Sequence, residues 1–217
     1  LADPQGFGKI EYAYYLMATE AGIDMSECRL HHEGGRSHFM TRRFDRDERG
    51  RKRHMQSLGA MQHFDFNDPA SYSYEQAVLT IRDLGLGMDV VEQQYKRAVF
   101  NVVARNQDDH VKNISFLMDR SGAWRLSPAY DVAYSYNPSG SWTRDHQMSL
   151  AGKRNDFTHG DLMVLASNVG LKSNKANQAI EDIVDAVAKW QEFAEQAGVE
   201  HSDMSRIEKT FRMNLRG

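Results

Sequence analysis

The sequence predicts an α+β domain that is mostly helical. Short strand patterns surround the Gly34–Gly35 pair and the Asp119–Gly122 turn, whereas the chain beyond about residue 155 shows only helical patterns. A few strands followed mainly by helices is the order found in α+β domains. The 217 residues are 41% apolar and 26% charged, which is typical of a globular chain with a substantial core. We expect residues 1–217 to form one domain, with a helical subdomain at about 155–217.

Apolar periodicity and capping residues predict six helices. Ser73 with Gln76, and Thr158 with Asp161, fit side-chain caps that begin two of them. The predicted helices cover about 9–21, 73–85, 88–105, 158–170, 175–196 and 203–213. The side chains predicted to face inward are Ile10, Tyr14, Met17, Ala18, Val91, Tyr95, Val99, Val102, Val103, Ile180, Ile183, Val184, Val187, Trp190 and Phe193.

Two hairpins are predicted, with a charged segment between them. The stretches "CRLHHEG" and "SHFMTRRFD" form strand patterns around Gly34–Gly35. Ile114–Met118 and Ala123–Leu126 form the second pair. Between the hairpins, Arg42–His54 holds seven Lys or Arg and three Asp or Glu residues, which indicates a solvated loop. A protein- or phosphate-binding role is the alternative for this segment.

Charge and composition argue against several functions. A net charge of −3 gives no basic footprint, so we expect no direct nucleic-acid contact. No apolar run approaches the ~18 residues of a membrane span. Cys28 is the only cysteine, so no internal disulfide can form, which fits a reducing cytoplasm. The scattered histidines argue against a structural zinc site, and the N-terminus does not resemble a signal peptide.

The stretch "NQDDHVKN", residues 106–113, directly follows a predicted helix and precedes the second hairpin. Because the ends of a hairpin lie side by side, Asn113 at its entrance and Asp131 past its exit should be neighbours. Asp108, five residues before Asn113, lies in a loop that returns toward the same end. Two carboxylates and one amide oxygen would then converge, which is a ligand set that suits Mg²⁺.

Phosphoryl transfer needs this equipment. One aspartate orients or deprotonates the attacking hydroxyl, while an asparagine five residues on and a second aspartate hold the metal. The order D-x₄-N, hairpin, D is that of kinase catalytic lobes. The alternative is a turn in which Asp108 and Asn113 only cap backbone amides. Lys112 could contact a transferring phosphoryl group; for His110, bracing the loop is favoured over direct acid–base work.

The same stretches closely resemble the HipA-like serine/threonine kinases, the toxin halves of bacterial toxin–antitoxin pairs. "NQDDHVKNISF" and "LSPAYDVAYSY" match the D-x-H-x-K-N-x-S-[FL] catalytic loop and the [ST]-P-x-Y-D metal segment of that family. "IEYAYYLMATEAGIDM", "FMTRRFDRD" and "HMQSLGA" resemble three upstream motifs. The resemblance runs from about residue 8 to beyond residue 190 and implies a kinase-like C-terminal lobe.

The resemblance also implies roles for individual residues. It makes Asp108 the catalytic base, with His110 and Lys112 in the catalytic loop, and Asn113 and Asp131 the Mg²⁺ ligands. The nucleotide, ATP, would be contacted by Arg43 and Phe44 at the adenine, by Asp45 near the ribose and by Gln56 at the floor of the site. Tyr130 would support the metal loop.

Two departures from the family pattern matter. Arg42 and Arg43 stand where the family usually has glutamate before R-F-D-R, which makes adenine recognition less secure. No phosphate-binding loop precedes residue 8, and "GFGK" at Gly6–Lys9 lies where the family enters its first C-lobe helix. We therefore expect the C-terminal portion of a longer kinase, or one half of a split kinase, with weak or no activity alone.

Three functions follow for this lobe. The first is an ATP- and Mg²⁺-dependent protein serine/threonine kinase with a protein substrate. The second is a small-molecule phosphotransferase with the same catalytic residues. The third is a non-catalytic kinase-like lobe that binds an antitoxin. The resemblance implies that this antitoxin is a small protein and that it is the DNA-binding component of the pair.

Overall fold

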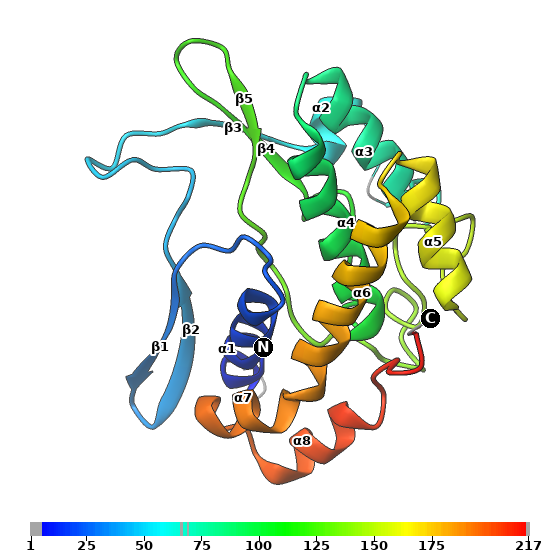
Figure 1. Ribbon diagram of the computed structural model, residues 1–217. Helices are drawn as coiled ribbons and strands as arrows, with labels where there is room; N and C mark the ends of the chain where they lie inside the picture. The colour runs from blue at the N-terminus through cyan, green and yellow to red at the C-terminus, as the bar shows by residue number, and fades with distance from the viewer. Residues whose placement is uncertain (1–5, 66, 69, 216–217) are drawn as a thin grey trace.

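The computed structural model describes residues 6–65, 67–68 and 70–215, and within them the chain forms eight helices and five strands (Figure 1). In chain order these are α1 (Phe7–Glu20), β1 (Cys28–Glu33), β2 (Arg36–Thr41), β3 (His54–Ser57), α2 (Leu58–Gln62), α3 (Tyr74–Asp83), α4 (Met88–Val103), β4 (Ser115–Met118), β5 (Trp124–Leu126), α5 (His159–Asn168), α6 (Ser173–Ala188), α7 (Trp190–Ala197) and α8 (His201–Glu208). The predicted α+β, mostly helical fold class is confirmed. Residues 1–5, part of the N-terminal stretch without a signal-peptide pattern, lie outside the described range.

The β1–β2 hairpin packs against α1 at one side of the molecule (Figure 1). Gly34 and Gly35 join the strands with φ values of 56° and 76°, the left-handed conformation that a two-residue type I′ turn requires. At Gly8, a Cβ atom would lie 2.8 Å from the carbonyl oxygen of Ser37, so only glycine permits this approach of helix to strand. The first predicted hairpin is confirmed, but β2 ends at Thr41 and does not continue to Asp45.

The second sheet has the strand order β3–β4–β5, with both neighbouring pairs antiparallel. The hairpin β4–β5 matches the predicted strands to within one residue. Strand β3 was not predicted, because His54 was assigned to the solvated loop and the strand forms only by pairing with β4, where Gln56 lies opposite Phe116. The rest of the loop, residues 42–53, forms no named strand or helix and is largely exposed, as expected.

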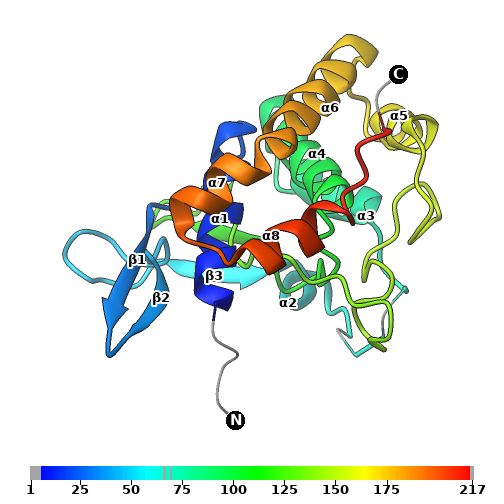
Figure 2. The same cartoon turned by 90° about the horizontal axis from the view of Figure 1, so that it is seen from below.

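The helices enclose one continuous apolar core that runs from α1 to α8. Helix α6 lies along α4 and also contacts α1 (Figure 2). The two predicted capping boxes are present at α3 and α5. All the predicted inward side chains are buried except Phe193, which is partly buried. The helical subdomain at about 155–217 stays a prediction.

Two predicted helices have different boundaries. The helix expected at 175–196 is broken at Lys189, where the backbone N–H bonds the Ala186 oxygen three residues back and α7 then starts. This turn directs Trp190 into the core, where its indole N–H donates to the Met204 oxygen at 3.1 Å. The last helix begins at His201 and ends at Glu208, before the predicted Met213. None of the described helices is long and apolar enough to cross a membrane.

Candidate active site

The polar stretch at 106–113 forms a loop between the end of α4 and the start of β4. The loop turns at Arg105, whose φ of 59° ends the helical path. Asn106 then bonds back to Asn101 of α4, through its backbone N–H to the oxygen of Asn101 at 3.0 Å and through its side-chain amide at 2.9 Å. These two bonds fix the start of the loop against the last turn of α4.

Ser135, which follows the β4–β5 hairpin, holds the same loop from the other side. Its hydroxyl oxygen accepts hydrogen bonds from the backbone N–H groups of Gln107 at 2.7 Å and Asp108 at 2.9 Å. These long-range bonds tie the segment that carries Asp108 to the segment that carries Asp131.

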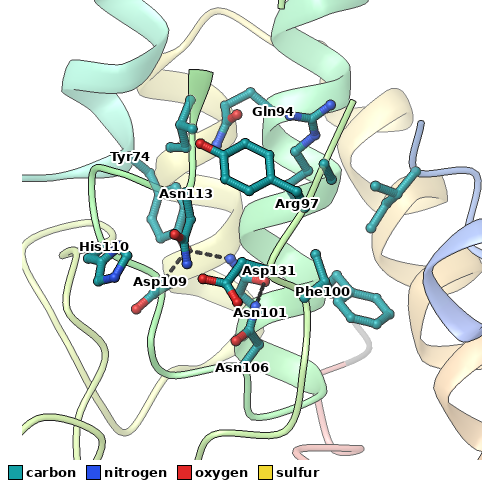
Figure 3. Close-up of a pocket in the computed structure, with 15 residues that line it drawn as sticks. Tyr74, Gln94, Arg97, Phe100, Asn101, Asn106, Asp109, His110, Asn113 and Asp131 are labelled. Atoms are coloured by element: carbon teal, nitrogen blue, oxygen red, sulfur yellow. Dashed lines mark hydrogen bonds between the residues drawn. The ribbon is translucent and has the colours of Figure 1, made fainter. Parts of the chain in front are cut away.

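The structure brings Asn113 and Asp131 together, as the hairpin geometry predicts. Both side chains line one small cavity of about 30 Å³, together with His110 and Tyr130 (Figure 3). A space of that size holds about one water molecule. It is therefore the floor of a site and not a pocket for a whole nucleotide.

The conformations of these two residues are specific. Asp131 has a φ of 56°, a left-handed conformation that aspartate adopts more readily than most residues. The side-chain NH₂ of Asn113 donates to the backbone oxygen of Asp108 at 3.0 Å. Because an amide has one NH₂ and one oxygen, this bond leaves the Asn113 oxygen as the group available to a cation.

Asp108 is a half-exposed carboxylate whose side chain is 48% accessible. Its pKa is raised above the ordinary value, mainly by burial, and the carboxylates of Asp131 and Asp109 raise it further against the opposing effects of His110 and Lys112. A raised pKa makes a carboxylate a more effective general base, because the pKa lies closer to the working pH. The repulsion from Asp131 also means that a cation between them would be stabilising.

A third carboxylate, Glu11 of α1, was not assigned a role from the sequence. Burial, and secondly the charge of Asp131, raises the pKa of Glu11 from 4.5 to about 7. Glu11 lies in the upstream stretch "IEYAYYL", and that match to a family motif was the one sequence signal that could have singled it out. Asp109, the neighbour of Asp108, was likewise not assigned a role from the sequence.

The remaining loop residues differ in their surroundings. His110 is half-buried, with Nε2 3.9 Å from Asp108 Oδ1. Lys112 is exposed. The hydroxyl of Tyr130 bonds the Lys112 backbone oxygen and lies 2.5 Å from Ser115 Oγ, so it links the two ends of the hairpin, which is the supporting contact expected of Tyr130.

None of the predicted nucleotide contacts lines the cavity, and of these residues only Phe44 contacts a residue that does. The Phe44 ring lies 5.3 Å from the Tyr130 ring, which places this residue next to the metal segment. Arg43 pairs with Asp45 at 2.6 Å, and Arg46 also contacts that carboxylate. The Asp45 carboxylate is thus occupied by two arginines. Gln56 is half-buried on β3, next to β4.

The arrangement fits a divalent cation of the hard, oxygen-binding kind. Among the described residues, no group of three or more His, Cys, Asp or Glu side chains forms a metal cluster. Mg²⁺ does not need such a cluster, because it is usually held by one or two carboxylates together with phosphate oxygens and water. Asp131 and the Asn113 oxygen supply such a partial set, with Asp108 beside them.

Comparison with known proteins identifies one relative with a kinase name and solved structures of similar fold. A curated Haemophilus influenzae protein with the name "Putative kinase" is 24% identical over 234 residues, which cover 94% of this chain and 68% of that protein. The HipA toxin of Shewanella oneidensis, solved in a complex with HipB and operator DNA, superposes with a TM-score of 0.77 at 16% identity. That match covers 98% of this chain but 55% of the HipA chain.

A second solved structure shares the fold less closely. The proinflammatory kinase CtkA of Helicobacter pylori superposes with a TM-score of 0.55 at 12% identity, covering 96% of this chain and 85% of CtkA. The sequence model of the HipA-like C-terminal domain matches residues 2–191, which is most of the chain and includes every residue of the candidate site. The chain therefore belongs to the HipA-like C-terminal domain family.

Proposed function

We propose that this chain is the catalytic portion of an ATP- and Mg²⁺-dependent serine/threonine-protein kinase of the HipA-like family. The observation that carries the proposal is the convergence of Asn113 and Asp131 at one cavity, with the raised-pKa carboxylate Asp108 beside it. Kinases require this combination of a base and two oxygen ligands. Its occurrence in a member of this family favours phosphoryl transfer over a turn that only caps amides.

Each residue of the candidate site has its own proposed role. The Asp108 carboxylate orients the hydroxyl of a protein substrate and accepts its proton. Asp131 and the Asn113 oxygen would hold Mg²⁺, and Lys112, exposed next to Asn113, would contact the transferring phosphoryl group. When bound, ATP would supply the phosphoryl group and Mg²⁺ would neutralise the negative charge of the phosphates. The position of the Phe44 ring next to Tyr130 supports an adenine site on that side.

The proposal also concerns the portion of the longer relatives that this chain does not span. The chain spans 55% of the HipA chain and 68% of the Haemophilus protein. Since phosphoryl transfer needs charge stabilisation on both faces of the triphosphate, we expect full activity only when the remaining portion is present. A small DNA-binding antitoxin is the proposed partner, because the HipA structure was solved with HipB and operator DNA.

The test compares Mg-ATP binding and phosphorylation by the chain alone and by a longer protein that includes it. Calorimetry should show weak Mg-ATP binding by the chain alone and tighter binding by the longer protein. In the longer protein, Asp108→Asn should abolish phosphoryl transfer to a protein substrate without changing the melting temperature, whereas Asp119→Asn, in an exposed turn, should leave it intact. Unchanged phosphorylation by Asp108→Asn would contradict the assignment.

A further inference from the structure

Asp109, the neighbour of Asp108, lies at the centre of a buried hydrogen-bond network. Its carboxylate accepts bonds from the Tyr74 hydroxyl at 2.5 Å, from His146 Nδ1 at 2.8 Å and from the backbone N–H of Gln147 at 2.7 Å. The side chains of Asp109 and His146 are 1% and 0% exposed. Because both side chains are almost fully buried, we assign neither residue a direct contact with a reacting atom.

The network continues from His146 to the C-terminal segment. Arg212 Nη1 lies 3.1 Å from His146 Nε2 and 3.0 Å from the Val102 oxygen. Arg212 Nη2 donates to Asn155 Oδ1 at 2.5 Å. The backbone N–H of Arg212 donates to the Val103 oxygen at 3.0 Å, which fixes the segment against the end of α4.

The partners of His146 determine which of its nitrogens carries the proton. A guanidinium group has donors and no acceptor, so a hydrogen bond between Arg212 and His146 requires an unprotonated Nε2. The proton of the imidazole must then be on Nδ1, where it is donated to Asp109. A doubly protonated ring would place two N–H groups against each other at Nε2.

Arg212 is protonated in this setting. Burial, and secondly the nearby charge of Arg105, lowers the pKa of Arg212 to about 10, which still leaves it charged at neutral pH. Burial alone would raise the pKa of Asp109, but the hydrogen bonds that its carboxylate accepts from His146 Nδ1–H, the Tyr74 hydroxyl and the Gln147 amide hold it below its ordinary value. A neutral imidazole therefore connects a partly buried cation to a buried anion, and the three groups together are electrically balanced.

We infer that Arg212 and His146 are positioning residues for the catalytic loop. Arg212 fixes His146 as the neutral Nδ1–H tautomer, and His146 in turn fixes Asp109 and hence the backbone that carries Asp108. The consequence for catalysis rests on the proposed function, but the tautomer and the hold on the loop do not. Arg212, which follows α8, thus helps to orient the loop at residues 106–113.

The first test measures the tautomer of His146 directly. In ¹⁵N-labelled protein at neutral pH, His146 should show a pyrrole-type nitrogen shift at Nδ1 and a pyridine-type shift at Nε2. This measurement needs no substitution and no phosphoryl transfer. A proton on Nε2, alone or together with one on Nδ1, would overturn the inference.

The second test measures how firmly Arg212 holds the loop. Arg212→Met removes the donors and keeps most of the side-chain length, so the backbone amides of Asp108 and Gln147 should exchange hydrogen about tenfold faster relative to amides of α6. Arg212→Lys keeps a charged donor and should restore part of the protection. Arg206→Met, which removes an exposed arginine paired with Asp203 on α8, is the matched control and should change neither amide.

The outcomes separate this inference from the proposed function. Equal hydrogen exchange of the Asp108 and Gln147 amides in Arg212→Met and in the unchanged protein would overturn the inference, even if the protein is an active kinase. Slower-exchanging loop amides in Arg212→Lys than in Arg212→Met would support it, even if no phosphoryl transfer is found. If Arg212→Met does not fold, the ¹⁵N measurement still decides.

Discussion

The two sides of the candidate site are held by different kinds of contact. On the catalytic-loop side, the partners are distant in sequence: Asp108 bonds Ser135 27 residues away, and Asp109 bonds Gln147 38 residues away. On the nucleotide side, the ion pairs join near neighbours: Arg43 lies two residues from Asp45, and Asp47 four residues from Arg51. The former contacts are partly or fully buried and the latter are mostly exposed.

This difference indicates which half of the site the chain organises by itself. Long-range bonds among buried groups exist only in the folded domain, so the catalytic loop takes its shape from the fold. Pairs between neighbouring residues at the surface contribute little to stability. The catalytic-loop side is therefore preorganised, whereas the proposed function predicts that the nucleotide side is ordered by ATP or by the further portion of a longer protein.

Asp109→Asn should produce the largest loss of stability. The carboxylate accepts from three donors, and an amide in its place has one oxygen for them and presents an NH₂ to the others. We expect the free energy of unfolding to fall by about 3 kcal/mol, because buried donors lose their acceptor. Chemical denaturation monitored by circular dichroism measures the change.

Asp119→Asn is the matched substitution on an exposed turn. Asp119 also accepts from backbone N–H groups, those of Ser121 at 2.8 Å and Ala123 at 3.1 Å, but solvent can replace these bonds. Its cost should be much smaller than that of Asp109→Asn, because Asp119 is exposed. Equal losses for the two substitutions would remove the distinction between a buried, fold-determined loop and a local turn.

Glu11→Gln should have an intermediate effect that depends on pH. The folded pKa of about 7 lies above the unfolded value of 4.5, so ionised Glu11 destabilises the fold, and the penalty grows as the pH rises from 4.5 to 7. The substitution should therefore stabilise the protein by about 1–2 kcal/mol above pH 7, after allowing for solvent screening, and by almost nothing near pH 4.

The pH series for Glu11→Gln can be repeated with Mg²⁺. A cation at Asp131 would counter the repulsion between the two carboxylates, so the stabilisation should shrink when MgCl₂ is added. A stabilisation that is independent of pH, or that is lost at high pH and present at low pH, would contradict the raised pKa of Glu11. A stabilisation that MgCl₂ leaves unchanged would contradict the repulsion between Glu11 and Asp131.

What the sequence predicts correctly is local. Ser73 and Gln76 cap α3 through bonds within one turn, and the hairpin brings Asn113 to Asp131 because its two strands are adjacent in the chain. The break at Lys189 could not be predicted, because apolar periodicity continues across it and the contact that requires it, from Trp190 to Met204, depends on the packing of α8. Strand β3 likewise forms only against β4.

The same division applies to the site. The motif around Asp108 is continuous in the sequence, and so is the segment with Asp131. The electrostatic interaction of Glu11 with Asp131 and the hydrogen bond between Arg212 and His146 join positions more than sixty residues apart, and no spacing rule connects them. Resemblance to a family identifies residues in shared motifs, whereas the buried network behind Asp109 is visible only in the folded chain.

Asp45→Asn should have the smallest effect on stability. The pKa of Asp45 is held below its ordinary value chiefly by the hydrogen bond from Arg43, so its contribution is present above pH 4 and is lost as the pH falls below that. Because Arg43 is exposed, the loss at pH 7 should be less than about 1 kcal/mol and should vanish in high salt.

The Asp45→Asn substitution also tests the predicted ribose contact. In the longer protein, a tenfold loss of Mg-ATP affinity with unchanged stability would mean that Asp45 exchanges its arginine partners for the nucleotide. Unchanged affinity would mean that the Arg43–Asp45 pair only shapes the segment, and the ribose would then need another partner.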